Sequence, residues 1–531
     1  MEFNLADLFE SVADAVPERE ALVCGDRRLT YKELDERATR LAHHLSSIGV
    51  GAGDHIGLYL YNGTEYVESM IACFKIRAVP INVNYRYVER ELQYLLGDAD
   101  LTGLIHQREF CPRILAIKDN LPMLEKFVLV EDSSGADCST LGSTEYESAL
   151  ALASEKRDFE PRSSADLFIL YTGGTTGMPK GVVWRHEDLF FTAMGGGNPL
   201  GEPVEKPDEV APNARDKDPV TQFPIPPLIH GAAQLGVFIC FNWGGKIVLA
   251  PRFDPVASWD LVEKEKVNTI TLVGDAIARP LAETLQATKD QRDVSSLVYI
   301  SSAGAVLTDP VKDLLKELLP NTIVAESFGS SETGFQGMES GGGRMRFVMN
   351  ERTTVLNDDL KPVEAGSGDV GRVALKGRIP MGYYKDEEKS AQTFVEADGE
   401  RWVLLGDMAT VEADGSITVF GRGTVCINSG GEKLFPEEIE NAVKSHPDVY
   451  DVVVVGVPDE RWGEKVAAVV QTRPGATPTL ESIQEHSRAL IAGYKVPRAL
   501  KIVERIERQP SGKPDYPWAK KIAAEEVLEV G

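Results

Sequence analysis

The sequence predicts an α/β protein that ends in a small separate unit. Across about the first 420 residues, amphipathic helical segments alternate with short apolar runs. Continuous apolar runs of this kind are typical of strands in a sheet that helices cover on both faces. From about Asp359 the pattern becomes strand-rich with Gly-Asp-Gly turns, which indicates a small barrel or meander. At ~150 residues per domain, a chain of 531 residues should contain three to four structural units.

The elements of the larger part follow from local patterns in chain order. Apolar residues at steps of four and three follow Thr30, a candidate helix cap, and predict a helix from Leu34 to Ile48. A strand beginning at His55, a helix over residues 65–76 and a strand beginning at Val79 come next. Five later apolar runs predict strands separated by helices: residues 168–171, 246–250, 269–273, 297–300 and 322–325.

Two segments mark joints in the chain. Residues 195–218 are rich in Gly, Pro and charge, which predicts a long surface loop. Residues 421–424 precede a compact tail that has its own helices and strands. The predicted helices of this tail cover residues 437–444 and 480–491, and its predicted strands cover residues 451–457 and 466–471.

The charge balance excludes several classes of function. With 56 basic and 82 acidic residues the net charge is −26, and nucleic-acid binding relies on Lys and Arg to neutralise phosphates. The acidic, amphipathic start lacks the basic region and apolar core of a signal peptide. The most apolar run, residues 231–240, is about half of the ~20 residues that span a membrane. We therefore expect a cytoplasmic protein with no nucleic-acid partner and no integral membrane segment. The sequence leaves a homodimer open.

The cysteines predict neither a metal site nor a disulfide framework. All six are scattered without a CxxC pair or metal-ligand spacing, so we expect reduced thiols. A GxGxxG pattern at residues 366–371 is followed by a strand-like segment instead of the helix that a dinucleotide site requires. No Walker A loop is complete, because Lys180 lies between Pro179 and Gly181.

Residues 171–182, YTGGTTGMPKGV, predict a phosphate-binding loop. They follow a buried-looking strand and contain three glycines and three threonines within six residues. Glycines let backbone amides approach an anion closely, threonine hydroxyls add donors, and Lys180 adds a point charge.

This stretch resembles the signature of the acyl-adenylate-forming superfamily, which includes acyl-CoA synthetases, luciferases and the adenylation domains of peptide synthetases. Further motifs follow in that family's order, and together the resemblance spans about residues 25–515. These motifs are LTYKEL at residues 29–34, FGSSET at 328–333, Gly406-Asp407, Gly421-Arg422, GGE at 430–432 and PSGK at 510–513.

The resemblance implies a fold and a domain division. It implies a large N-terminal domain, residues 1–422, made of two helix-covered sheets plus a small β-barrel-like part. A small mobile α+β C-terminal domain, residues 423–531, is then expected to rotate between the two steps of the reaction. The hinge departs from the family pattern, because Thr424 and Val425 stand where acidic or basic residues are common. Tyr516 likewise stands where an arginine is common, so the energetics of rotation are left open.

The resemblance also implies site residues. Lys513 would bridge the substrate carboxylate and the α-phosphate of ATP, and Glu332 with Thr172 would hold Mg²⁺. Phe328 would stack on adenine beside the turn at residues 302–305, and Asp407 and Arg422 would bind the ribose. His230 would gate the carboxylate pocket, or else it is a satisfied core histidine. The implied nucleotide-binding residues are Thr172, Gly173, Gly174, Thr175, Thr176, Gly177, Lys180, Gly304, Ala305, Phe328, Gly329, Ser331, Asp407 and Arg422.

The predicted activity is ATP-dependent ligation of a carboxylic acid to coenzyme A through an acyl-AMP intermediate, with Mg²⁺ as cofactor. Small residues such as Gly231 and Gly334 favour a bulky acid. Residues 75–86, the loop from Gly195 and PIPPLIHGAAQ at residues 224–234 resemble actinobacterial fatty-acid and steroid-side-chain CoA ligases. Two alternatives remain: an acyl-AMP ligase that loads a separate carrier protein, and a catalytically silent nucleotide-binding homologue.

Overall fold

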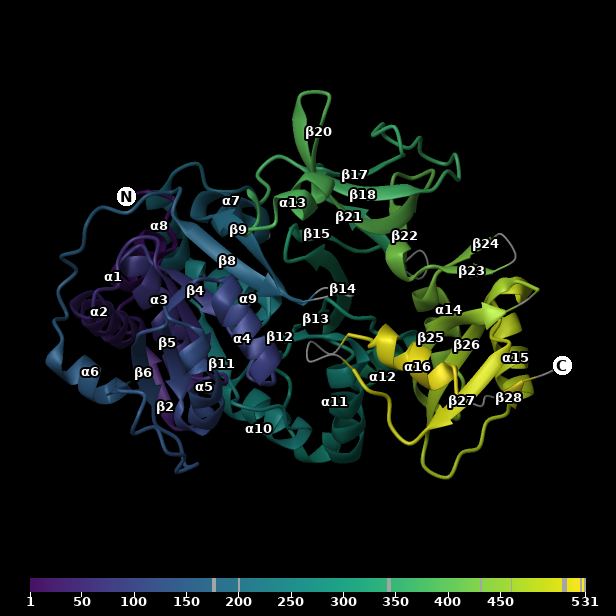
Figure 1. Ribbon diagram of the computed structural model, residues 1–531, viewed down its shortest axis with the longest axis horizontal. Coiled ribbons are helices and arrows are strands. Elements are labelled where there is room, and N and C mark those ends of the chain that lie inside the picture. Colours follow the sequence, from purple (N-terminus) through teal and green to yellow (C-terminus); the bar gives the residue numbers. More distant parts are fainter. Residues whose placement is uncertain are drawn as a thin grey trace.

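The computed structural model describes residues 1–173, 178–198, 201–340, 345–429, 432–459, 461–508, 513–525 and 528–529. Within these ranges the strands form three hydrogen-bonded sheets. Two belong to the large N-terminal part, and the third belongs to the tail, which lies at one end of the long axis (Figure 1).

The first sheet begins with a mainly parallel half in the order β2-β1-β11-β10-β12-β13-β14. Only β2 runs antiparallel to its neighbour in this half. Its strands are β1 (Glu20–Cys24), β2 (Arg27–Thr30), β10 (Thr221–Pro224), β11 (Lys246–Leu249), β12 (Thr269–Leu272), β13 (Tyr299–Ser302) and β14 (Ile323–Ser330).

The strand-rich part predicted from about Asp359 continues this same sheet. Beyond β14, antiparallel pairs extend it in the order β15-β16-β22-β21-β18-β17, with β20 beside β21. These strands are β15 (Gly334–Glu339), β16 (Arg346–Met349), β17 (Thr353–Leu356), β18 (Gly371–Lys376), β20 (Phe394–Ala397), β21 (Glu400–Val411) and β22 (Ile417–Arg422). The segment after the GxGxxG pattern is indeed a strand, β18.

The second sheet has the order β19-β9-β8-β4-β3-β5-β6-β7. The strands from β8 to β7 in this order are parallel, whereas β9 and β19 run antiparallel to their neighbours. The strands are β3 (His55–Tyr59), β4 (Val79–Asn82), β5 (Leu101–Gln107), β6 (Lys126–Val130), β7 (Thr144–Glu145), β8 (Leu167–Thr172), β9 (Lys180–Arg185) and β19 (Gly382–Tyr383).

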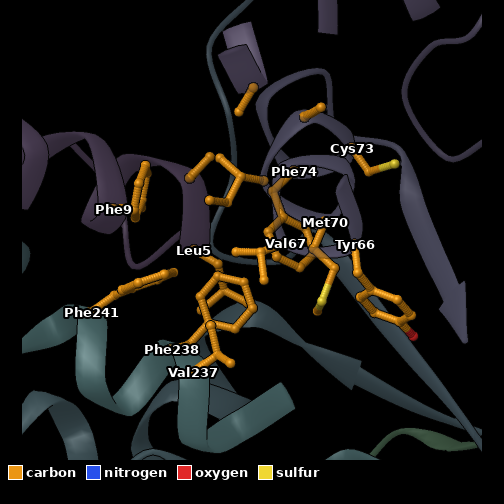
Figure 2. Packing of buried hydrophobic residues seen from close by; sticks show 14 of the residues in the cluster. Leu5, Phe9, Tyr66, Val67, Met70, Cys73, Phe74, Val237, Phe238 and Phe241 are labelled. Atoms are coloured by element: carbon orange, nitrogen blue, oxygen red, sulfur yellow. The ribbon is translucent and has the colours of Figure 1, made fainter. Parts of the chain in front are cut away.

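Helices pack between the two sheets and on their outer faces. The central core joins residues of both sheets to α1 (Leu5–Ala15), α2 (Tyr31–Ser47), α3 (Thr64–Lys75) and α9 (Gly231–Asn242). Figure 2 shows α1, α3 and α9 meeting through Phe9, Phe74 and Phe241. The apolar run at residues 231–240 is therefore a buried helix, which explains its composition without a membrane. No helix in the described ranges is long and apolar enough to cross one.

The outer layers complete the N-terminal part. Helices α4 (Glu89–Asp98) and α5 (Cys111–Ile117) cover the free face of the second sheet. The free face of the first sheet is covered by α10 (Pro255–Glu265), α11 (Gly274–Thr288) and α12 (Asp309–Leu318). Shorter helices are α6 (Tyr146–Leu152), α7 (His186–Ala193), α8 (Val210–Asp216) and α13 (Glu387–Thr393).

The tail builds its own sheet with cores on both faces. Its strands are β23 (Ile427–Ser429), β24 (Glu432–Leu434), β25 (Val449–Asp459), β26 (Gly463–Thr472), β27 (Ala499–Val503) and β28 (Leu528–Glu529). Its helices are α14 (Pro436–Lys444), α15 (Leu480–Arg488) and α16 (Tyr516–Ala523). Lys444 of α14 reaches Asp275 of α11 at 3.2 Å, so the tail is docked on the N-terminal part.

The helix after Thr30 is confirmed, and two other predictions are corrected. Thr30 caps α2 in a capping box with Glu33. Residues 195–218 are not wholly a loop, because Val210 and Ala214 bury one face of α8 against the central core. Cys111 and Cys138 are not free thiols but form a disulfide, with 5.4 Å between their Cα atoms. They meet because each follows one of two adjacent parallel strands, β5 and β6.

Candidate functional site

The predicted phosphate loop joins two paired strands of the second sheet. Thr172 ends β8, Lys180 begins β9, and the two residues are cross-strand partners. Gly173 continues from the end of β8. Gly174, Thr175, Thr176 and Gly177 lie outside the described residues. The antiparallel pair therefore holds both ends of the loop close together, at the end of the pair where β8 stops and β9 starts.

Lys180 has a carboxylate partner from a distant segment. Its ammonium group forms an ion pair with Asp386, the residue that caps α13. It also lies 5.7 Å from the centre of the Tyr383 ring. The positive charge that the sequence analysis assigns to phosphate is thus partly balanced by Asp386.

Glu332 lies just beyond β14 and is buried, with 8% of its surface exposed. Its Oε1 accepts a hydrogen bond of 2.8 Å from the Tyr383 hydroxyl. The carbonyl of the preceding residue, Ser331, accepts one of 3.0 Å from the indole of Trp184 on β9. These two bonds fasten the FGSSET segment to the second sheet, beside the phosphate loop.

Gly329 in this segment cannot carry a side chain without movement of the backbone. A Cβ placed there would lie 2.1 Å from the carbonyl oxygen of Gly334. Two of the small residues that the sequence suggested as room for an acyl group are likewise explained by packing: a Cβ on Gly334 would meet Ala193 at 2.6 Å, and one on Gly231 would meet Leu170 at 2.4 Å.

The predicted adenine slot lies at the carboxyl ends of two neighbouring strands. Gly304 and Ala305 follow β13, and Phe328 lies near the end of β14, its parallel neighbour. Phe328 is partly buried and packs on Phe347, with 5.4 Å between ring centres. Gly304 adopts φ +80°, a left-handed conformation that favours glycine. No neighbour lies within 4 Å of a Cβ built there, so the backbone remains accessible.

Asp407 and Arg422 are cross-strand partners on β21 and β22. The guanidinium Nε lies 3.6 Å from a carboxylate oxygen of Asp407. Burial and the nearby charge of Glu332 raise the pKa of Asp407, while Arg422 and Lys513 oppose this shift.

Lys513 reaches this cluster from the tail, three residues before α16. Burial and the charge of Arg422 lower the pKa of its ammonium group, and Glu332 and Asp407 act in the opposite direction. Four charged groups that are far apart in the sequence therefore share one electrostatic environment.

His230 is the residue immediately before α9. Burial, together with the positive charges of Arg86 and Lys513, lowers the pKa of its imidazole to about 4, so the ring is neutral near pH 7. Asn82 at the end of β4 fixes this segment. Its amide donates 2.7 Å bonds to the carbonyls of Tyr171 and Ile229, and its oxygen accepts a 2.8 Å bond from the Tyr171 amide.

Three residues near the site were missed from the sequence. Asn82 carried a signal, because it is a polar residue within the apolar run of a buried strand. The sequence offered no such signal for Asp386, because its partner Lys180 lies far away along the chain. The same holds for Tyr383 and its partner Glu332.

The arrangement can hold a nucleotide with a hard divalent cation. No group of three or more His, Cys, Asp or Glu side chains suited to a metal occurs in the described part of the chain. Mg²⁺ seldom needs one, because it usually takes one or two protein carboxylates together with substrate phosphates and water. Glu332 and Thr172 offer oxygen ligands of the required kind, so the residues fit such an ion.

The comparisons with known proteins cover nearly the whole chain. The AMP-binding enzyme model matches residues 9–384, and the AMP-binding enzyme C-terminal domain model matches residues 438–513. The 3-oxocholest-4-en-26-oate–CoA ligase of Rhodococcus rhodochrous is 49% identical, over 98% of this chain and 96% of that protein. The medium/long-chain-fatty-acid–CoA/3-oxocholest-4-en-26-oate–CoA ligase of Mycolicibacterium smegmatis is 47% identical, over 99% and 97%.

Solved structures share the fold. An anthranilate CoA ligase in complex with anthranoyl-AMP is 26% identical and superposes with a TM-score of 0.85, over 98% of both chains. A fatty acyl CoA synthetase of Mycobacterium tuberculosis is 24% identical, with a TM-score of 0.70 over 98% of both chains.

Proposed function

Because the chain belongs to the AMP-binding enzyme family, we propose how its residues join a bulky carboxylic acid to coenzyme A. It is an AMP-forming acyl-CoA synthetase. The acid's carboxylate attacks the α-phosphate of ATP, pyrophosphate leaves, and acyl-AMP forms. The thiol of CoA then attacks the acyl carbon, and AMP leaves. Since ATP and CoA are the co-substrates, we place the enzyme in the cytoplasm.

One observation supports the residue assignment: the buried Lys513 of the tail lies within the electrostatic influence of Glu332, Asp407 and Arg422 of the N-terminal part. In the first step two anions, a carboxylate and a phosphate, must approach each other. A cation placed between them stabilises the charge of the transition state without reorganisation of solvent. Lys513 is assigned this role.

The other residues bind and orient ATP. Thr172, Gly173 and the loop that follows hold the β- and γ-phosphates together with Lys180. Gly304, Ala305, Phe328, Gly329 and Ser331 form the adenine side, and Asp407 and Arg422 bind the ribose hydroxyls. Glu332 and Thr172 hold Mg²⁺, which neutralises the polyphosphate when it is bound.

His230 contributes as a neutral group. Since its pKa of about 4 lies well below 7, it can hydrogen-bond the acid without adding positive charge beside Lys513. We assign it to the carboxylate end of the acyl pocket, where Asn82 fixes the backbone of the preceding residue.

The proposed acid is a steroid side chain or a medium- to long-chain fatty acid. Support comes from relatives at 47–49% identity whose names specify these acids. The division into a domain of residues 1–422 and a mobile domain of residues 423–531 is also a proposal. It is supported by the separate sheet and cores of the tail.

The test is a substrate panel with purified enzyme, ATP and Mg²⁺. AMP release is measured with CoA and either acetate, octanoate, palmitate or 3-oxocholest-4-en-26-oate. We expect the steroid acid or the longer fatty acids to give the highest kcat/KM and an acyl-CoA product. A preference for acetate would contradict the substrate class. Acyl-AMP that accumulates and is not consumed by CoA would contradict the acceptor.

A further inference from the structure

Tyr383 is fixed in place by contacts from several parts of the chain. It lies on the short strand β19, where it pairs with Val182 of β9. Its backbone amide donates a 2.8 Å hydrogen bond to the hydroxyl of Ser390 on α13. The ring packs edge-on against Phe394, with 5.6 Å between ring centres. Contacts within the chain itself therefore fix both the backbone and the ring of Tyr383.

The hydroxyl of Tyr383 donates a hydrogen bond to the Glu332 carboxylate. It lies 2.8 Å from Glu332 Oε1. A phenol is ordinarily protonated near neutral pH, and an ionised carboxylate can only accept a hydrogen bond, so the hydroxyl is the donor of this pair. Tyr383 is also the one described side chain that donates a hydrogen bond to this carboxylate, which leaves Oε2 without such a bond among the described residues.

Tyr383 connects two parts of the ATP site. The ammonium group of Lys180 lies over the ring, and the carboxylate of Glu332 lies at the hydroxyl. Since Lys180 begins the strand after the phosphate loop and Glu332 follows β14, one side chain spans the junction between the two sheets.

We propose that Tyr383 is a positioning residue for the Mg²⁺–ATP complex: its hydroxyl orients the Glu332 carboxylate, fixing one oxygen and leaving the other for the cation. This inference rests on the proposed function, which assigns Glu332 to Mg²⁺. Ligating carboxylates are commonly held by such outer hydrogen bonds, and loss of one typically weakens metal binding by ~10–100-fold.

The neighbouring residue offers a matched control. The Tyr384 hydroxyl donates a 2.9 Å bond to Asp100, and the ring packs on His55, with 5.1 Å between ring centres. Tyr384→Phe therefore removes a tyrosine–carboxylate bond of the same kind from the same segment, away from Glu332. Both substitutions keep the aromatic ring and its packing.

The experiment measures ATP binding by calorimetry in the presence of Mg²⁺ and in EDTA. For the native enzyme and Tyr384→Phe we expect Mg²⁺ to tighten ATP binding by the same factor. For Tyr383→Phe we expect that factor to fall by ~10-fold or more, with the dissociation constant in EDTA unchanged. Thermal melting of each variant checks that the fold is intact.

A double-mutant cycle with Glu332→Gln separates positioning from general packing. If the hydroxyl acts through Glu332, Tyr383→Phe has no further effect on the Mg²⁺ factor in the Glu332→Gln background. An equal effect of Tyr383→Phe in both backgrounds would overturn the proposal. It would also be overturned if Mg²⁺ tightened ATP binding to Tyr383→Phe by the same factor as in the native enzyme. If Mg²⁺ does not tighten ATP binding to the native enzyme, the assignment of Glu332 to Mg²⁺ fails first and the proposal falls with it.

Discussion

Replacement of Lys444 by Met tests whether docking of the tail controls the first step of the reaction. Lys444 Nζ lies 3.2 Å from Asp275 of α11 and 2.9 Å from Asp451 of β25, and its side chain is only 9% exposed. Asp275 is more deeply buried still, at 4%. This cluster is a buried ionic contact between the two parts of the chain, and the same docking brings Lys513 into the site.

The structure sets the size of the effect. The Asp451 bond lies within the tail, so its loss affects docked and undocked states alike, and Arg508 continues to pair with that carboxylate at 2.7 Å. Only the Asp275 bond changes docking. Asp275 keeps Arg279 at 3.1 Å and accepts two bonds from Thr308, so no charge is left uncompensated. The loss is then that of one charged hydrogen bond, about 1.5–3 kcal/mol. Acid-dependent ATP–pyrophosphate exchange should fall by about 10- to 150-fold.

The matched control breaks an exposed pair at the same interface. Arg473 lies 3.6 Å from Glu283, with side chains 39% and 44% exposed, and such pairs contribute little. Arg473→Met should therefore change exchange by less than about fivefold. Conversion of supplied acyl-AMP to acyl-CoA should not slow in Lys444→Met, because the tail is predicted to move for that step. Equal losses in both half-reactions, or equal losses in both variants, would refute the reasoning.

Two further predictions concern the FGSSET segment and the junction with the tail. Gly329→Ala, whose Cβ would lie 2.1 Å from a carbonyl oxygen, should lower the free energy of unfolding by about 1–3 kcal/mol or more. Gly51→Ala, with nothing within 4 Å, should leave the melting temperature nearly unchanged; equal melting of the two variants would contradict this. Burial, together with Glu440 and Asp407, raises the pKa of Glu437 to about 8. The folded state therefore binds more protons than the unfolded state between about pH 4.5 and pH 8. The contribution of Glu437 to the free energy of unfolding should be complete below about pH 4.5 and should be lost as the pH rises to 8. Glu437→Gln should flatten that decline in denaturant titrations at pH 5, 6.5 and 8, and an unchanged slope would contradict the assignment.

Local patterns predicted most of the elements because their causes are local. Thr30 and Glu33 lie three residues apart and form a capping box in any context that permits the helix. The strand before the phosphate loop was visible as a continuous apolar run, since both of its faces are covered. Helix α8 was missed because Gly and Pro dominate its surroundings, while only two of its residues, Val210 and Ala214, are buried.

Contacts between distant segments could not be predicted in the same way. Cys111 and Cys138 meet because β5 and β6 are neighbours in the sheet, and spacing in the chain does not encode that order. The pairing of Lys180 with Asp386 depends on β19 lying against β9. The nucleotide-binding roles of the motif residues come from the resemblance, which assigns them by position in the sequence, and they stay predictions.

The most direct test of the assigned mechanism is acid-dependent ATP–pyrophosphate exchange by Lys513→Ala, measured beside Lys520→Ala. Lys520 is an exposed lysine of the same tail, on α16, and its loss should leave exchange near the native rate. Loss of a preorganised transition-state donor typically lowers the rate by ~10²–10³-fold, so we expect exchange by Lys513→Ala to fall at least that far with unchanged thermal melting. Near-native exchange by Lys513→Ala would contradict the assignment of Lys513 to the adenylation step.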